Sequence, residues 1–483
     1  MSIDEVQRVK KLLYVGGQWR AASDGDCFTV EDPADESQIA TVTSASPQDA
    51  LAAVDAAHRA GPEWAARPPR ERGEILRRAF ELMIERRERL ARLIVAENGK
   101  ALSEARGEVT YAAEFLRWYS EEAVRIDGAV FAAPSGANRI LVARQPIGVS
   151  LFVTPWNFPA AMVTRKLGPA LAAGCTIVLK PAPETPLTAL AMAELLEEAR
   201  VPAGVVNVIP THRAGETVGA MLRDPRVRKL SFTGSTEVGR LLLAQAAAGV
   251  VKCSMELGGN APFLVFADAD LDAAVTGAMV AKMRNGGESC TAANRFYVER
   301  QVADAFAQRF AEQMRKTKLG PGLEEGVQLG PLVNRKALDK VVALVDDAVA
   351  LGATALTGGK AIDRKGYFYP PTVLANVSKD ARLLKEEIFG PVAPIASFDS
   401  LDEAIALAND TPFGLASFVY SADLAKALRV AERLETGMVG INRGVVSDPA
   451  APFGGWKQSG IGREGAHDGL LEYLETKYIA ATW

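Results

Sequence analysis

The stretch VSLFVTPWNFP, residues 149–159, opens the part of the chain that decides the fold. Its first five residues form a short apolar run rich in β-branched side chains. Similar runs follow at intervals of about 25–29 residues, at 176–179, 205–209 and 229–232. Helical patterns fill the segments between them, at about 159–173, 184–200 and 214–223. This alternation predicts βαβ units, in which helices cover both faces of a parallel sheet.

Outward from this region, residues 70–98 predict one long amphipathic helix that stops at Asn98-Gly99. A second α/β part is predicted over about 257–460, with strand candidates at 263–266, 295–298 and 416–420. Two further runs, at 139–144 and 477–482, have no obvious home sheet and look like extended arms. Such arms fit a β-interaction between subunits.

Composition excludes several function classes. The chain has 483 residues, 48% hydrophobic and 24% charged, which suits a globular protein of two or three domains. A net charge of −4 offers no basic surface for nucleic acid or an anionic membrane. No run approaches the ~20 apolar residues of a membrane span, and the first residues lack the apolar core of a signal peptide. We therefore expect a cytoplasmic protein that binds neither nucleic acid nor membrane.

The spacing of cysteine and histidine predicts neither a disulfide framework nor a metal site. None of the four cysteines forms a C-x-x-C pair, and the three histidines are scattered. Cys290 closes the stretch MRNGGESC, and a lone cysteine is more often a small buried apolar residue than a nucleophile. Together with Asn157 and Glu256 it gains a different meaning. A thiol, an amide donor and a carboxylate can attack a carbonyl, stabilise the oxyanion and activate water.

Two turns after predicted strands could hold a phosphorylated cofactor. The turn FTGSTEVG, residues 232–239, is neither a G-x-G-x-x-G nor a Walker A loop. Ser235 and Thr236 could cap a helix whose N-terminus receives a phosphate, and a plain helix cap explains them equally well. Lys180, in KPAPETP, offers a cation suited to ribose hydroxyls, although by itself it reads as a surface charge.

Five blocks together resemble the aldehyde dehydrogenase superfamily over essentially the whole chain. They are TPWNFP, FTGSTEVG, MELGG, EEIFGP and PFGGWKQSGIGRE. The resemblance implies an α/β fold with a parallel-sheet dinucleotide-binding domain, an α/β catalytic domain and a small β oligomerisation arm. We assign residues 1–124 and 145–256 to the first, 257–465 to the second, and 125–144 and 466–483 to the arm. It also implies a homodimer or a homotetramer.

The resemblance assigns roles residue by residue. Cys290 would be the nucleophile, Glu256 the general base, and Asn157 an oxyanion donor beside the backbone N–H of Cys290. The thiolate would add to an aldehyde, the nicotinamide of NAD or NADP would take a hydride, and Glu256 would activate the water that hydrolyses the thioester. Glu464 would lie on a proton-exit route, or would be a solvated acid. The remaining residues would line the dinucleotide: Trp156, Lys180, Gly234, Ser235, Glu387 and Phe389.

Two arginines narrow the class of aldehyde that we expect as substrate, although each arginine alone would be interpreted as a surface charge. The chain is most similar to succinate-semialdehyde dehydrogenases, which carry arginines at the positions of Arg165 and Arg284 and bind the far carboxylate with them. A guanidinium suits that task because it forms two parallel hydrogen bonds with a carboxylate. Beside Ser447, Asp448 departs from the subfamily, and its carboxylate could repel the substrate or hold one arginine. Glutarate or 2-oxoglutarate semialdehyde, an uncharged aldehyde, and a non-catalytic binding or structural role are the alternatives.

Two more departures concern redox control and the cofactor. Some relatives have a second cysteine two residues after the nucleophile, where this chain has Ala292, so we expect no disulfide switch. Many NAD-preferring relatives have a glutamate at the position of Pro183, which repels the 2′-phosphate of NADP. We therefore expect both cofactors to be used, although Glu184 could still disfavour the phosphate.

Overall fold

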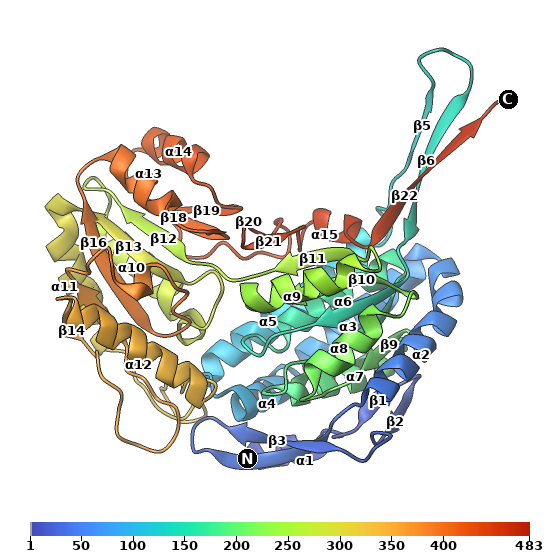
Figure 1. Ribbon diagram of the computed structural model, residues 1–483, viewed down its shortest axis with the longest axis horizontal. Coiled ribbons are helices and arrows are strands. Elements are labelled where there is room, and N and C mark those ends of the chain that lie inside the picture. Colours follow the sequence, from blue (N-terminus) through green and yellow to red (C-terminus); the bar gives the residue numbers. More distant parts are fainter. Residues whose placement is uncertain (1) are drawn as a thin grey trace.

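Five parallel strands form the centre of the first sheet in the computed structural model, which describes residues 2–483 (Figure 1). Their order is β9-β8-β7-β10-β11. A hairpin and β21 extend the two edges with antiparallel strands. The bounds are β1 (Leu13–Val15), β2 (Gln18–Arg20), β7 (Val149–Val153), β8 (Thr176–Lys180), β9 (Val206–Val208), β10 (Val227–Thr233), β11 (Lys252–Glu256) and β21 (Gly460–Ile461). The four strands predicted between residues 149 and 232 are therefore confirmed.

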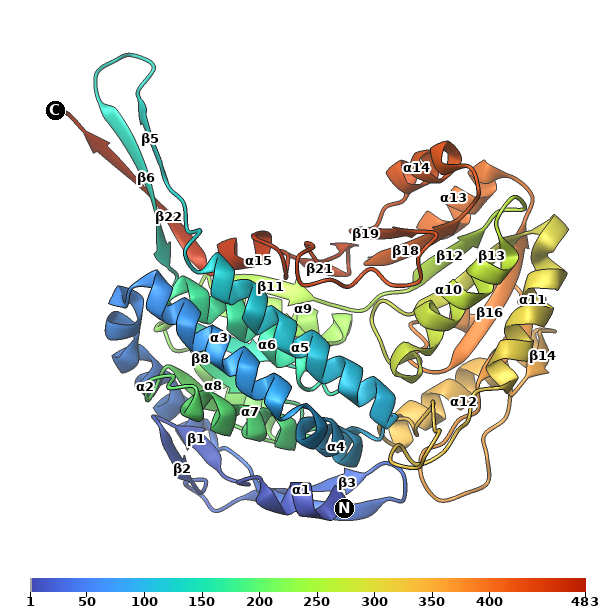
Figure 2. The same cartoon turned by 180° about the vertical axis from the view of Figure 1, so that it is seen from behind.

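Helices cover both faces of this sheet because its central strands are apolar on both sides. Ile177 and Leu179 pack into one apolar cluster, and Val178 packs into the other. One face carries α3 (Pro69–Glu85), α4 (Arg87–Asn98), α5 (Leu102–Glu122), α6 (Ala161–Ala173) and α7 (Pro186–Glu198) (Figure 2). The other face carries α2 (Pro47–Ala66), α8 (Ala214–Leu222) and α9 (Thr236–Ala247).

The single helix predicted over residues 70–98 is two helices. Arg86 interrupts them with φ −94° and ψ 15°, which ends α3 and lets α4 begin in a new direction. The break allows α3 to pack on α6, whereas α4 packs on α1 (Ser2–Arg8) and α7. The apolar period continues through the break, so the pattern alone did not reveal it.

The second sheet has six parallel strands and one antiparallel edge strand, in the order β14-β15-β16-β13-β12-β18-β19. The bounds are β12 (Ala261–Val265), β13 (Ala293–Glu299), β14 (Thr354–Thr357), β15 (Thr372–Ala375), β16 (Val392–Phe398), β18 (Ala416–Tyr420) and β19 (Met438–Ile441). Its helices are α10 (Leu271–Met283), α11 (Arg300–Arg315), α12 (Arg335–Ala350), α13 (Leu401–Asn409) and α14 (Leu424–Arg433). The α/β class predicted from the sequence is confirmed.

A three-stranded antiparallel sheet projects from the body as an arm (Figure 1). It contains β5 (Ala129–Ala132), β6 (Arg139–Pro146) and β22 (Leu474–Ala481). The two runs that had no home sheet in the sequence pair with each other, from Leu474 opposite Pro146 to Ala481 opposite Arg139. Their partner therefore lies in the same chain. The arm strand β5 completes the sheet beside β6.

The remaining elements are short. They are β3 (Cys27–Asp32), β4 (Ser37–Thr43), β17 (Phe413–Gly414), β20 (Trp456–Lys457), α15 (Asp468–Leu471) and the 3₁₀ turns at Arg284–Gly287 and Arg382–Leu384. Within residues 2–483, no helix has the length and apolar character needed to cross a membrane.

Candidate active site

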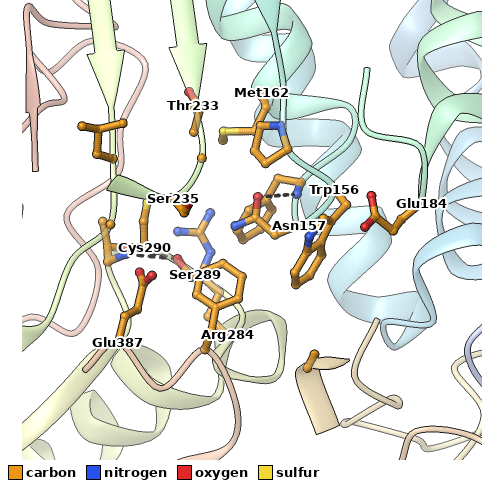
Figure 3. A pocket seen from close by; sticks show the side chains of 18 of the residues that line it. Trp156, Asn157, Met162, Glu184, Thr233, Ser235, Arg284, Ser289, Cys290 and Glu387 are labelled. Carbon is orange, nitrogen blue, oxygen red and sulfur yellow. Dashed lines mark hydrogen bonds between the residues drawn. The ribbon is translucent and has the colours of Figure 1, made fainter. Parts of the chain in front are cut away.

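A cavity of about 420 Å³ lies where the carboxyl ends of β7 and β10 meet the loop before β13. Figure 3 shows Cys290 and Glu387 on one side of it, Asn157 and Trp156 across from them, and Glu184 beyond Trp156. Ten of the residues singled out in the sequence line this cavity: Trp156, Asn157, Arg165, Gly234, Ser235, Arg284, Cys290, Glu387, Phe389 and Ser447. Segments far apart in the chain therefore converge on one site.

The loop that presents Cys290 depends on glycines at close approaches. Asn285, Gly286 and Gly287 have φ values of 55°, 62° and 79°, which bend the chain out of α10. A Cβ on Gly287 would lie 2.2 Å from the carbonyl oxygen of Gly390, so only glycine fits there. A Cβ on Gly259 would lie 2.3 Å from the carbonyl oxygen of Cys290 itself. The glycines of both motifs therefore let the thiol loop pack against its surroundings.

The Cys290 thiol is held in its neutral form. Burial raises its pKa to about 12, Glu387 and Glu256 add to that shift, and the positive charges of Arg165 and Arg284 oppose it. A neutral thiol is a weak nucleophile, so the site needs a base to form the thiolate.

The side chain of Asn157 is fixed by two hydrogen bonds. Its Nδ2 donates to the carbonyl oxygen of Glu288 at 3.0 Å, and its Oδ1 accepts from the Phe158 N–H at 3.1 Å. These contacts define which end of the amide is the donor, and Nδ2 keeps a second hydrogen. Because Glu288 lies two residues before Cys290, the first bond links the amide directly to the thiol loop.

Glu256 ends β11 and is 2% exposed. Among the described residues its Oε2 has no hydrogen-bond partner. Burial raises its pKa well above the ordinary value, and Glu464 raises it further, whereas Lys166 and Arg165 oppose the shift. Glu256 does not line the cavity, but its neighbour Leu257 does. A buried carboxylate with a vacant acceptor is suited to take a proton from a water held at the wall.

Glu464 lies in a buried polar network and not on the surface. It accepts a hydrogen bond from Lys166 Nζ, which also donates to Thr233 Oγ1 at 2.7 Å. Arg165 Nη1 lies 3.6 Å from Glu464 Oε2. The alternative of a solvated acid is therefore wrong, since Glu464 is 4% exposed.

The two arginines differ in how they are engaged. Arg165 Nη2 donates to Tyr111 Oη at 2.6 Å, and its guanidinium lies 4.0 Å from the ring centre of Phe453. Arg284 contacts the rings of Phe158 and Tyr111 at 5.2 and 5.3 Å, and within residues 2–483 it has no ion pair. Its charge is therefore free to meet an anion in the cavity.

Asp448 does not face this cavity. Its side chain is exposed, and Oδ1 accepts a hydrogen bond from the Ala450 N–H at 2.9 Å. The neighbouring residue Ser447 lines the cavity in its place. Asp448 thus forms a turn, and within residues 2–483 it makes no ion pair with an arginine.

Comparisons with known proteins decide the family. The Aldehyde dehydrogenase family profile matches residues 19–479. The chain belongs to the aldehyde dehydrogenase family. It is 55% identical over 441 residues to the succinate-semialdehyde dehydrogenase of Paenarthrobacter nicotinovorans, covering 91% of this chain and 98% of that one. It is 51% identical to the glutarate-semialdehyde dehydrogenase of Pseudomonas putida, covering 99% of each. The solved structure of an NADP-dependent enzyme from E. coli matches with a TM-score of 0.97 at 49% identity, covering 98% of each chain.

This aldehyde dehydrogenase is an NAD(P)-dependent oxidoreductase, as its sequence predicted. Two features of its cavity wall are compatible with a dinucleotide. Gly234 lines the cavity, and a Cβ there would lie 2.5 Å from the Phe232 ring, so this turn has no room for a side chain unless that ring moves. Ser235 Oγ accepts from the Val238 N–H at 3.4 Å and caps α9, whose N-terminus favours a phosphate group.

Two other parts of the cavity suit the nicotinamide half. The rings of Trp156 and Phe389 meet edge to face with centres 5.4 Å apart. Glu387 Oε1 accepts from the Gly259 N–H at 3.1 Å, and burial raises the pKa of Glu387 to about 7. Its carboxylate could accept hydrogen bonds from ribose hydroxyls.

Lys180 is the last residue of β8, Pro183 lies in the loop after it, and neither residue lines the cavity. Burial lowers the pKa of Lys180 to about 8, and the opposing charge of Glu184, which does line the cavity, limits the shift. The sequence analysis considered Glu184 beside the cofactor phosphate, but it missed Tyr111 as the partner of Arg165. Tyr111 is the tenth residue of α5 and belongs to no motif, so no signal in one sequence could have identified it.

Proposed function

We propose that this aldehyde dehydrogenase oxidises succinate semialdehyde to succinate with NAD or NADP. The observation that carries the proposal is Arg284, a cation without an ion pair that shares a cavity with Cys290. Arg165 and Ser447 line the same cavity and can complete the binding of a carboxylate. The substrate names of the relatives, succinate and glutarate semialdehyde, are both aldehydes with a carboxylate tail.

The residues divide the first half of the reaction between them. With the substrate carboxylate on the arginines, its aldehyde carbon lies toward Cys290. A solvent water takes the thiol proton, which leaves the attacking thiolate. The free hydrogen of Asn157 Nδ2 and the backbone N–H of Cys290 stabilise the oxyanion that forms. A bound nicotinamide supplies a hydride acceptor for the collapse of this adduct. The Cys290 thioester is then left.

Glu256 acts in the second half of the reaction, the hydrolysis of the thioester. Its vacant Oε2 takes a proton from a water, which attacks the thioester and releases the acid. The proton then has a buried path through Lys166, Thr233 and Glu464. We assign Glu464 to this path because its carboxylate raises the pKa of Glu256 and touches the lysine.

The test compares kcat/KM for succinate semialdehyde, glutarate semialdehyde and butanal in the wild type and in Arg284→Met. We expect the wild type to prefer succinate semialdehyde over butanal by ~100-fold, as one charge-assisted contact gives. Arg284→Met should lose most of that preference and leave butanal turnover near the wild-type value. Arg443→Met is the matched control, because Arg443 is exposed and lies outside the cavity.

Equal kcat/KM for butanal and succinate semialdehyde in the wild type would contradict the proposal that the enzyme recognises the carboxylate of its substrate. A preference for glutarate semialdehyde would favour the second candidate, which the relative from P. putida supports by its name. Loss of all turnover in Cys290→Ala would support a cysteine thioester in either case.

The domain division, the homodimer or homotetramer and the cytoplasmic location stay predictions. The division follows the two sheets and the arm, with residues 1–124 and 145–256, 257–465, and 125–144 with 466–483. We propose that the arm joins subunits, because its strands β5 and β22 are open edges that carry apolar side chains.

A further inference from the structure

A buried ion pair lies under the turn that presents Asn157. Lys100 Nζ lies 2.6 Å from Glu108 Oε2, and the two side chains are 4% and 0% exposed. Lys100 follows α4, and Glu108 lies on α5. Neither residue lines the cavity, and neither takes part in the reaction steps described above. A buried ion pair is by itself weak evidence for stability, so its contacts decide what it does.

Lys100 holds the backbone of Asn157. Its Nζ donates to the Asn157 carbonyl oxygen at 2.7 Å and lies 4.5 Å from the ring centre of Phe158. Asn285 Nδ2 donates to the same carbonyl oxygen at 2.9 Å. Two donors from separate segments thus converge on one peptide group, and Asn285 belongs to the loop that presents Cys290.

Glu108 holds the next turn of the same segment. Its Oε1 accepts from the Ala160 N–H at 2.8 Å, and the N–H of Ala161 lies 3.4 Å from the same oxygen. These groups begin α6, whose N-cap residue Ala160 provides no capping side chain. Glu108 therefore supplies the cap from a neighbouring helix. The helix that it caps carries Arg165.

We propose that Lys100 and Glu108 are positioning residues that set the Asn157 amide relative to Cys290. Lys100 fixes the Asn157 carbonyl, Glu108 fixes the start of α6, and Asn285 ties the Asn157 carbonyl to the thiol loop. This inference rests on the proposed role of Asn157 as an oxyanion donor. Oxyanion donors act through geometry, and a small displacement from the oxyanion is enough to lose much of their effect.

The test separates position from stability with Lys100→Met, Glu108→Gln and the double variant. Each single variant leaves a buried charge without its partner, so both should melt at a lower temperature than the wild type. The double variant removes both charges, and its melting temperature should recover. Its kcat should stay about 10- to 100-fold below wild type, because the Asn157 carbonyl still lacks the ammonium donor. KM for the aldehyde should change by less than about threefold.

Lys229→Met is a matched control. Lys229 is another buried lysine, with Nζ 2.9 Å from Glu472 Oε2, and it does not line the cavity. This variant should melt at a lower temperature and keep its kcat. Recovery of kcat together with melting temperature in the Lys100→Met/Glu108→Gln variant would overturn the proposal.

A double-mutant cycle combines Lys100→Met with Asn157→Ala. It tests whether Lys100 acts through Asn157 even if the Lys100→Met/Glu108→Gln variant does not fold. In the Asn157→Ala background, Lys100→Met should lower kcat by less than about twofold, because the donor that it positions is already absent. A full additional loss would contradict the inference about the pair. An unchanged kcat in Asn157→Ala alone would instead refute the proposed role of Asn157.

Discussion

At the scale of the residue, Glu256 combines burial with an acceptor oxygen that no described group fills. Replacing it by glutamine keeps the shape and removes the base. We expect Glu256→Gln to form the thioester at close to the normal rate and to hydrolyse it ~100-fold or more slowly. Rapid mixing should then show a burst of one reduced cofactor per site followed by a slow steady state. Loss of the burst itself would place Glu256 in the formation of the thiolate.

The pH dependence of thioester hydrolysis, measured in the wild type and in Glu256→Gln, is a second test of Glu256 as the base. Hydrolysis needs the ionised carboxylate, and the pKa of Glu256 lies well above its ordinary value. The wild-type hydrolysis rate should therefore fall as pH drops through this raised pKa, closer to neutrality than for an exposed glutamate. Glu256→Gln should lack that step.

Motifs predicted the residues to which we assign the chemistry, but not those that hold them in place. Asn157 and Glu256 each stand in one of the five blocks, Cys290 closes the stretch MRNGGESC, and Asn157 and Cys290 line the same cavity. Lys100 and Glu108 act on backbone groups more than fifty residues away. A donor to a distant carbonyl leaves no spacing pattern in one sequence. The sequence placed Asp448 near the substrate for a similar reason. The direction in which each side chain points is not visible in the sequence, and Ser447 lines the cavity whereas Asp448 accepts a hydrogen bond within a turn.

At the scale of the element, the carboxyl end of β8 carries Lys180, for which the sequence predicts a role at the adenosine end of the cofactor. Lys180 has a pKa of about 8 because burial lowers it. It is mostly charged at pH 7 and mostly neutral at pH 9, and only the charged form attracts the 2′-phosphate of NADP. The Kd for NADP should therefore rise by up to ~10-fold between pH 7 and pH 9, whereas the Kd for NAD should rise much less.

Lys180→Met provides the control for this titration. It should bind NADP at pH 7 as weakly as the wild type does at pH 9, and its Kd should depend little on pH. A wild-type Kd for NADP that stays flat across this range would remove Lys180 from phosphate recognition. Pro183 and Glu184 would then be the residues to examine, since Glu184 lines the cavity.

The same scale shows which elements a single sequence predicts. Strands such as Val149–Val153 and Thr176–Lys180 are buried along their whole length, so their apolar runs were visible. The edge strands Gln18–Arg20 and Thr354–Thr357 are short and lack buried residues, so their sequences do not stand out. The break at Arg86 was hidden because two consecutive helices kept one apolar period.

At the scale of the whole molecule, the arm leaves apolar side chains outside any core. Val130, Phe131, Tyr478 and Ile479 are 67%, 49%, 59% and 43% exposed on a sheet that projects from the body (Figure 1). Such a group on the surface of one chain marks an interaction site. A second copy of the chain is the occupant that a projecting antiparallel sheet with open edges best fits.

We therefore expect Phe131→Asp together with Tyr478→Asp to weaken the assembly by roughly 100-fold or more, because a carboxylate buried in an apolar interface lacks a partner. Light scattering should show a smaller mass in the variant at the same concentration. Ile362→Asp, an exposed apolar position outside the arm, is the control and should leave the mass unchanged. No arm residue lines the cavity, so kcat per subunit should survive separation if each site is complete within one chain. An unchanged mass in the double variant would mean that another surface makes the subunit contact. A lower mass together with a lower kcat would mean that assembly holds the cavity in its active shape.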